Sequence, residues 1–249
     1  MEERNRLTGI RKHLYEEVYG GHDLLRRYGV PDLGRLMLAE LALCASKAGM
    51  PALDRLETIG VSLELIRLAV SRHYESTSPD GKFDLITADY YYARAISLAS
   101  NIPSPRAVSS LSKAVVEIAS AEASFSAKVN WEIGEARNRA GLFAAAGELG
   151  GHAAGLDEAR IKVLSEFARQ IGVAYLGISG ALPGPLVEKL GQVDFLIQEA
   201  ASFIDGEIES SATAALVEFA RSILNGGNNA RDCKGLVCAD AQDLALRTD

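Results

Sequence analysis

The chain has 249 residues and a net charge of −7, with 26 Lys and Arg residues against 33 Asp and Glu residues. This acidic balance, without a dense basic cluster, argues against nucleic acid or an anionic membrane surface as the main partner. Hydrophobic residues make up 48% of the chain and charged residues 24%, which is the balance of a folded globular domain.

The location of the protein can be judged from its apolar runs and its cysteines. No run of 18 apolar residues could form a transmembrane helix, and the first 12 residues are charged from the second position, unlike a secretory signal. Three cysteines, Cys44, Cys233 and Cys238, cannot build a disulfide framework. The sequence therefore predicts a cytoplasmic protein.

Eight or nine helices are expected, with the prolines between them. All seven prolines separate apolar-periodic segments, where a missing N–H is tolerated, and the segments are rich in good helix formers. No segment shows the sustained alternation of a strand. In chain order, helices are predicted at 2–28, 32–49, 52–76, 84–100, 104–129, 131–153, 157–182, 186–206 and 208–224.

These elements predict an all-α fold, a single large helical bundle. Long helices joined by short loops pack as antiparallel neighbours, and each helix should turn one apolar stripe inward. In the helix at 104–129 that stripe consists of Leu111, Ala114, Val115, Ile118 and Phe125. We expect residues 1–224 to form one domain, with residues 225–249 as a loosely held tail.

One predicted helix carries an unusual row of glycines. Gly147, Gly151 and Gly155 are four residues apart, and such a row lets another backbone approach closely. Because glycine weakens a helix, we expect something to pack there. Tight contact inside the bundle is the simpler interpretation, and a subunit interface is the alternative.

Histidines and cysteines do not assemble a recognisable centre. The histidines are widely scattered, and the pair Cys233 and Cys238 has no second pair or nearby His to complete a zinc site. Neither a Gly-x-Ser-x-Gly elbow nor a Gly-rich phosphate loop ending in Gly-Lys-Ser/Thr occurs. The four histidines are His13, His22, His73 and His152.

The carboxylates give no clear metal site either, because the chain contains no Asp-Asp pair. Asp80 and Asp84 have i, i+4 spacing, but Pro79 and Gly81 flank Asp80, so the two are not expected to share a helical face. Asp84 is instead expected to be an N-cap or first-turn acid. We therefore predict no metal, no cofactor and no catalytic residue in this chain.

A family resemblance is carried by three segments, at 63–69 (LELIRLA), 88–95 (ADYYYARA) and 141–150 (GLFAAAGELG). They resemble, in order, the helix before the first aspartate-rich motif, the Gly-Asp-Tyr-Leu-x-x-x-Ala helix start and the small-residue helix after Lys-Thr of the trans-type polyprenyl diphosphate synthases. The resemblance runs from about residue 33 to residue 205. It implies a helical bundle of the isoprenoid synthase type.

The chain departs from this family at every charged motif. Arg-His-Tyr-Glu-Ser at 72–76 stands where the first Asp-Asp-x-x-Asp is expected, and Tyr-Leu-Gly-Ile-Ser-Gly at 175–180 replaces Phe-Gln-x-x-Asp-Asp. The family's Lys-Thr falls on Asn138 and Arg139. The loop before Asp89, which carries an Arg pair in the family, is shortened.

The chemical consequence of these departures is severe. Prenyl transfer ionises an allylic diphosphate, and magnesium ions held by two aspartate clusters stabilise the departing charge. The loss of one such contact typically costs about 10² to 10³ in rate, and here all of them are replaced. The resemblance therefore implies the small, non-catalytic subunit of a heteromeric, heptaprenyl- or hexaprenyl-type synthase.

Such a subunit would form a heterodimer with a catalytic chain that carries the aspartate-rich motifs and the magnesium, and would help to set product length. Whether it also forms a homodimer alone stays open. Family dimers pack through helices equivalent to 89–100 and 104–125. The candidate interface residues are Tyr90, Tyr91, Tyr92, Ile118 and Phe125.

Three consecutive tyrosines cannot all face one core, and a ring with a polar tip suits an interface. The alternative is one core ring with two half-exposed ones, and an ordinary core position for Ile118 and Phe125. Two other functions stay open, because fold does not fix function. One is a divergent terpene-type synthase that uses Glu75, Asp80, Asp84 or Asp89, and the other is a helical interaction or lipid-binding scaffold.

Overall fold

The computed structural model describes residues 2–20, 25, 33–74, 81–127, 133–182, 198, 201–202 and 204–226. In these ranges the regular elements are helices and none is a strand, which confirms the all-α prediction. None of these helices is both long and apolar enough to span a membrane. The helices are α1 (Glu2–Gly20), α3 (Met37–Ser46), α4 (Leu53–Tyr74), α5 (Gly81–Ser100), α6 (Pro105–Ser126), α7 (Ile133–Arg139), α8 (Gly141–Ala153), α9 (Glu158–Ile178) and α12 (Ser210–Gly226).

The helix boundaries differ from the predictions at a few places. The segment expected as one helix at 131–153 is divided at Ala140 into α7 and α8. Gly81 belongs to the first turn of α5 and not to the preceding loop. Most of the helix expected at 186–206 and the expected tail after Gly226 lie outside the described residues. The single-domain assignment of 1–224 stays a prediction.

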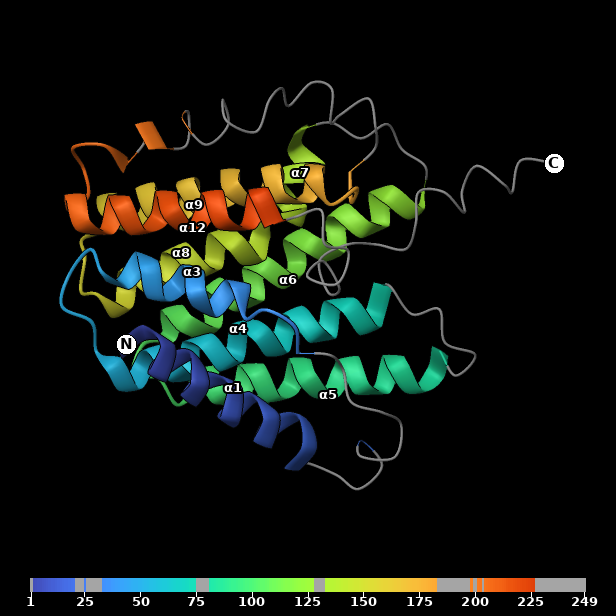
Figure 1. Cartoon of the computed structure of the whole chain (residues 1–249). Coiled ribbons are helices and arrows are strands. Elements are labelled where there is room, and N and C mark those ends of the chain that lie inside the picture. Colours follow the sequence, from blue (N-terminus) through green and yellow to red (C-terminus); the bar gives the residue numbers. More distant parts are fainter. Residues whose placement is uncertain are drawn as a thin grey trace.

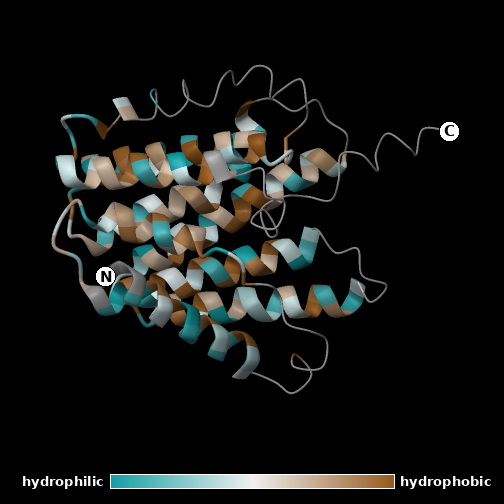
Figure 2. Ribbon diagram, viewed as in Figure 1, coloured by the Kyte–Doolittle hydropathy of each residue, from teal (hydrophilic) through white to brown (hydrophobic). Residues whose placement is uncertain are grey.

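The helices α4 and α8 lie in the middle of the bundle. The helix α8 packs against α3, α6 and α9, while α4 packs against α1, α3 and α5. The helix α12 closes the bundle over α3 and α9 (Figure 1). Helix α3 is packed against α4, α8 and α12, and α8 is packed against α3, α6 and α9. Because both helices are enclosed, their residues are mostly apolar, and Figure 2 colours them tan to brown over most of their length.

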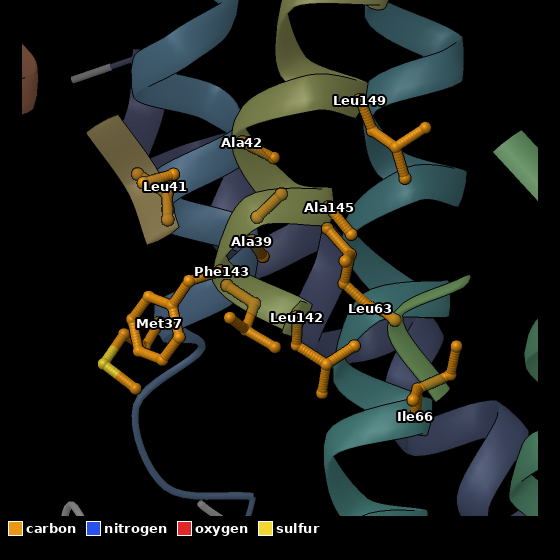
Figure 3. Packing of buried hydrophobic residues seen from close by; sticks show 14 of the residues in the cluster. Met37, Ala39, Leu41, Ala42, Leu63, Ile66, Leu142, Phe143, Ala145 and Leu149 are labelled. Atoms are coloured by element: carbon orange, nitrogen blue, oxygen red, sulfur yellow. The ribbon is translucent and has the colours of Figure 1, made fainter. Parts of the chain in front are cut away.

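The core forms where α3, α4 and α8 meet. Figure 3 shows Met37 of α3, Leu63 and Ile66 of α4, and Leu142 and Phe143 of α8 among the packed side chains. Each of these side chains is at most 4% exposed. Burial of each such side chain stabilises the fold by about 1.5–3 kcal/mol, so this contact is a main source of stability.

Glycines in α8 bring the neighbouring backbones close. A Cβ on Gly147 would lie 2.5 Å from the carbonyl oxygen of Leu164 in α9, and a Cβ on Gly150 would lie 2.5 Å from that of Ala42 in α3. Gly151 also faces α9, at Leu164. Contact inside the bundle is thus confirmed for Gly147 and Gly151.

Two other glycines differ from the predicted row. Gly155 lies beyond the end of α8 with φ +73°, so it terminates the helix in the left-handed conformation and does not pack in the row. Gly150, which the four-residue spacing omits, makes the close approach to α3. The glycines of α8 therefore serve two different faces, because Gly147 and Gly151 face α9 and Gly150 faces α3.

A buried ion pair connects α4 to the start of α3. The Glu64 carboxylate, fully buried, accepts hydrogen bonds from the backbone N–H groups of Leu38 (2.9 Å) and Ala39 (3.1 Å). Arg67 donates to the same carboxylate at 2.5 Å and to the carbonyl oxygen of Leu33 at 3.0 Å. Glu64 therefore satisfies N–H groups that the first turn of a helix leaves without partners.

Candidate functional site

The two segments at which the resemblance predicts the family's aspartate-rich motifs lie at one end of the bundle, which we call the motif end. Residues 72–74 are the last residues of α4, and residues 175–178 are the last residues of α9. Figure 1 shows these helix ends on the same side as the start of α5, the end of α6 and α7. The fold thus brings these two segments, which are about 100 residues apart in the chain, to the same end of the bundle.

At the first motif position an arginine forms an ion pair inside the chain. Arg72 at the end of α4 donates to Asp84 in the first turn of α5, with Nη1 2.7 Å from Oδ1. Asp84 is only 3% exposed, and its place in the first turn confirms the sequence prediction. The carboxylate that came nearest to a metal-ligand spacing is therefore engaged by an arginine.

A second arginine lies where the resemblance predicts the family's Lys-Thr. Arg139 at the end of α7 pairs with Glu122 of α6 at 2.8 Å, and the two side chains are 5% and 6% exposed. Its Nη1 donates to the carbonyl oxygen of Ala181, just after α9, and its guanidinium lies 5.9 Å from the centre of the Phe125 ring. This cation therefore joins α6, α7 and the end of α9.

Aromatic rings fill the space beside these pairs. The His73 ring meets Tyr74 edge-on at 4.8 Å and Tyr92 at 6.4 Å between ring centres. Burial, with the nearby Tyr74, Asp89 and Glu122, raises the pKa of the Tyr92 phenol well above its usual value. Burial also raises the pKa of Tyr91 to about 12. Both phenols are therefore neutral at physiological pH.

Carboxylates suited to hold a divalent cation do not converge at the motif end. No three His, Cys, Asp or Glu side chains of the described ranges come together as a possible metal site. Asp89 is exposed on α5, while Glu75 and Asp80 lie outside those ranges. The absence of a metal site and of a cofactor from this chain stays a prediction.

The five predicted interface residues separate into two groups. Tyr91 and Ile118 are each 2% exposed and belong to the core of the chain, so they offer no surface to a partner. Tyr90 and Tyr92 are partly buried against that core, and Phe125 is partly buried beside Arg139. Tyr91 is thus a core ring, with the partly buried Tyr90 and Tyr92 on either side of it in the sequence. This arrangement is the alternative to an interface that the sequence left open.

The outer faces of α5 and α6 carry a surface that the sequence reasoning missed. Among the described residues, the large exposed apolar side chains include Leu85 and Ile86 of α5 and Val116 of α6, which are 44%, 65% and 68% exposed. Along α6 six exposed residues follow each other at spacings of three and four, and we call this row the α6 seam. It consists of Ser109, Ser112, Val116, Ala119, Ala123 and Ser126.

The charges in the second half of α6 point away from this seam. Glu117 pairs with Arg169 of α9 at 3.0 Å, and Glu122 pairs with the buried Arg139. The outward side of α6 from Ala114 onward therefore carries no charged side chain. The alternating spacing of small residues is visible in the sequence, and it was the signal that could have identified this surface.

Known proteins that are similar to this chain in sequence or in fold include several prenyl diphosphate synthases. No known family model matches the chain. Among curated proteins, the chain is 26% identical over 164 residues to heptaprenyl diphosphate synthase component 2 from Geobacillus stearothermophilus. The match covers 57% of this chain, and the chain spans about half (51%) of the length of that relative.

Solved structures share the fold over most of the chain. A polyprenyl synthase from Roseobacter denitrificans matches with a TM-score of 0.72 and 17% identity, over 90% of this chain and 96% of that one. A polyprenyl synthase from Caulobacter crescentus, complexed with calcium and isoprenyl diphosphate, matches with a TM-score of 0.72 and 15% identity, over 89% and 94% of the two chains.

A geranylgeranyl pyrophosphate synthase from Lactobacillus brevis, complexed with citrate, matches with a TM-score of 0.73 and 13% identity, over 90% of this chain and 96% of that one. At these identities the structural likeness shows the fold, while the curated relative adds the likeness in sequence. The chain is thus similar in fold to polyprenyl and geranylgeranyl diphosphate synthases, and similar in sequence to a heptaprenyl diphosphate synthase component.

Proposed function

We propose that the chain is a non-catalytic subunit of a heteromeric trans-polyprenyl diphosphate synthase and that it supports a catalytic partner. The observation that carries this proposal is the pair of arginines at the motif end. Arg72 and Arg139 stand where the family has its first aspartate-rich motif and its Lys-Thr, and each is paired with a carboxylate of this chain. The name of the curated relative, component 2, supports an enzyme built from more than one component.

The charges at the motif end support the proposal that it is not a synthase site by itself. A departing diphosphate needs cationic stabilisation that increases as its C–O bond breaks. Arg72 and Arg139 are already neutralised by Asp84 and Glu122, so neither offers a free positive charge to that group. Removing a buried arginine from its carboxylate would leave an uncompensated buried charge, which typically costs 3–5 kcal/mol.

The partner supplies the aspartate-rich motifs and the magnesium ions, and this chain supplies a folded surface. The outer faces of α5 and α6 are the proposed contact surface, in line with the helices expected from the family resemblance. The exposed Ile86 and Val116 and the uncharged α6 seam support this choice, since the centres of protein interfaces are poor in charge. Tyr90, Tyr92 and Phe125 lie partly buried on the same two helices.

An effect on product length follows from such a contact. A subunit that packs on the catalytic chain stabilises one arrangement of its helices, and thereby one depth of the cavity that holds the growing apolar product. We expect the complex to release longer products than the catalytic subunit alone, or to be active where that subunit alone is not.

The experiment pairs the purified chain with an aspartate-rich synthase subunit from the same organism. The chain alone, given isopentenyl diphosphate, an allylic diphosphate and Mg²⁺, should consume no substrate. The two chains should co-purify, and the complex should form product that is greater in amount or in length. Turnover by the lone chain would refute the proposal.

A control separates support from hidden catalysis. Substitution of the partner's first aspartate-rich motif by alanine should abolish activity of the complex, while Asp89→Ala, at an exposed position of this chain, should leave the rate per assembled complex unchanged. Loss of activity in Asp89→Ala, with the complex still assembled, would instead favour a divergent synthase that uses its own acids.

A further inference from the structure

A groove follows α3 on the side of the bundle where this helix lies between α1 and α12 (Figure 1). It is a cavity of about 340 Å³, and Leu7 of α1 and Phe219 of α12 are among its lining residues. The α3 residues of the lining follow each other at spacings of three and four, so they share one face of the helix. They are Glu40, Leu43, Cys44 and Lys47. This face of α3 therefore has an acid at one end, a base at the other and apolar side chains between them.

The start of α5 carries the same spacing with the charges reversed. Four exposed residues share one face there, with two large apolar side chains between a base and an acid. They are Lys82, Leu85, Ile86 and Asp89. In both helices the two charged residues are seven positions apart, which is about 10.5 Å along the helix axis. A start of α5 laid along α3 in the same direction would thus place Lys82 at Glu40 and Asp89 at Lys47.

The cavity has room for the two apolar side chains of this face. A cavity of about 150 Å³ lined by Leu, Ile and Phe holds a benzene molecule. The cavity along α3, of about 340 Å³, therefore accommodates Leu85 and Ile86 together. Contact with Leu43 and Phe219 would remove from water apolar surface that the single chain leaves exposed.

The charges of the groove and of the α5 face are both balanced. Arg35 and Lys47 in the lining are matched by Glu40 and Glu218, so the groove favours an occupant without net charge. Arg35 already pairs with Glu40 at 2.6 Å, so a further cation there meets an acid that is partly neutralised. The contact of Lys47 with Asp89 is therefore the one that a charge substitution tests most directly.

A second copy of the chain can supply the occupant. Within one chain this face of α5 is exposed, so it does not fill the groove of its own chain. Two different surfaces then meet, one from each copy. Each bound copy still offers an unused groove or an unused α5, so the assembly can grow beyond two chains.

We propose that the groove between α1 and α12 binds the start of α5 from a second copy, with Leu85 and Ile86 in the cavity and Asp89 at Lys47. The inference concerns the lone chain and does not depend on the proposed function. The catalytic partner would displace the second copy, because the proposed contact surface includes Ile86. The contact uses about two turns of one helix, so we expect weak association, with a dissociation constant on the order of 100 µM.

The test reverses one charge on each side of the contact and measures the mass of the lone chain by sedimentation at rising concentration. Asp89→Lys and Lys47→Asp should each weaken self-association by at least about tenfold, because each places like charges together. An equimolar mixture of the two variants should regain it, since the reversed charge of one variant then meets the reversed charge of the other. Lys162→Asp, at an exposed lysine of α9, should associate like the wild type.

The outcomes are separable. A mass that rises with concentration, falls in both variants and returns in their mixture supports the inference. Recovery in the mixture also excludes misfolding as the cause of the loss, because the mixture contains the same chains. A wild-type chain that stays monomeric well above the expected dissociation constant would overturn the inference, and so would self-association that neither variant weakens or that the mixture fails to restore. Failure of the chain to bind a synthase subunit would count against the proposed function alone.

Discussion

Glu64 is a buried charge on which the packing of three segments depends. It is fully buried, it accepts two backbone N–H groups of α3, and it pairs with Arg67, which is 3% exposed. Glu64→Ala would leave a buried guanidinium and two backbone donors without this acceptor. We expect the free energy of unfolding to fall by about 3–5 kcal/mol, measured by urea denaturation.

A matched control for this change is Glu16→Ala. Glu16 is exposed, and its contact with Lys12 spans 3.9 Å on the surface of α1, so its removal should change stability by less than about 0.5 kcal/mol. A similar small effect for Glu64→Ala would show that the buried pair does not hold α3 in place.

We expect His152 to make the stability of the fold depend on pH in the mildly acidic range. Burial, then the positive charge of Arg106, lowers the pKa of His152 below 6.5, and only Glu148 acts in the opposite direction. The unfolded chain therefore binds a proton at His152 more readily than the folded chain does. The contribution of His152 to the free energy of unfolding is therefore complete above about pH 6.5 and declines as the pH falls through the lowered pKa. Urea unfolding at several pH values should show a smaller decline for His152→Gln, and an equal decline would contradict this account.

Helix α8 is held between two neighbours by the absence of side chains at two positions. Gly147→Ala and Gly150→Ala would each place a Cβ about 2.5 Å from a backbone oxygen, of Leu164 and Ala42 respectively, and backbone cannot yield cheaply. We expect each to lower the free energy of unfolding by about 1–3 kcal/mol, measured by chemical denaturation.

The control for the helix α8 variants lies in α7. Gly134 is exposed and a Cβ there meets nothing within 4 Å, so Gly134→Ala should raise stability by up to about 1 kcal/mol through helix propensity. If all three substitutions stabilised the protein, α8 would not approach the backbones of α3 and α9 as closely as described.

The whole molecule should respond to magnesium and diphosphate differently from a catalytic synthase. Ligand at 100 times its dissociation constant stabilises a folded protein by about 2.7 kcal/mol. At the motif end of this chain Arg72 and Arg139 already have carboxylate partners. We therefore expect no change in the midpoint of thermal unfolding of the lone chain with Mg²⁺ and inorganic diphosphate, and a clear rise for the aspartate-rich subunit. A rise of several degrees for the lone chain would refute this expectation.

The sequence by itself determined the helical class, most helix positions and the absence of any Asp-Asp pair. These are local properties, since helical periodicity and residue identity are read within one segment. The inward stripe of α6 illustrates this, because Leu111, Ala114 and Ile118 are buried as their spacing predicts. The break at Ala140 was missed, because no proline separates α7 from α8.

Only the tertiary structure decided which neighbour each face meets. It paired Arg72 with Asp84 and Arg139 with Glu122, residues 12 and 17 positions apart in the chain, and it gave Gly147 and Gly150 to different neighbours of α8. It also buried Tyr91 while leaving the α6 seam uncovered. A periodic pattern shows that a face is apolar, whereas the packing of distant segments determines whether that face is covered.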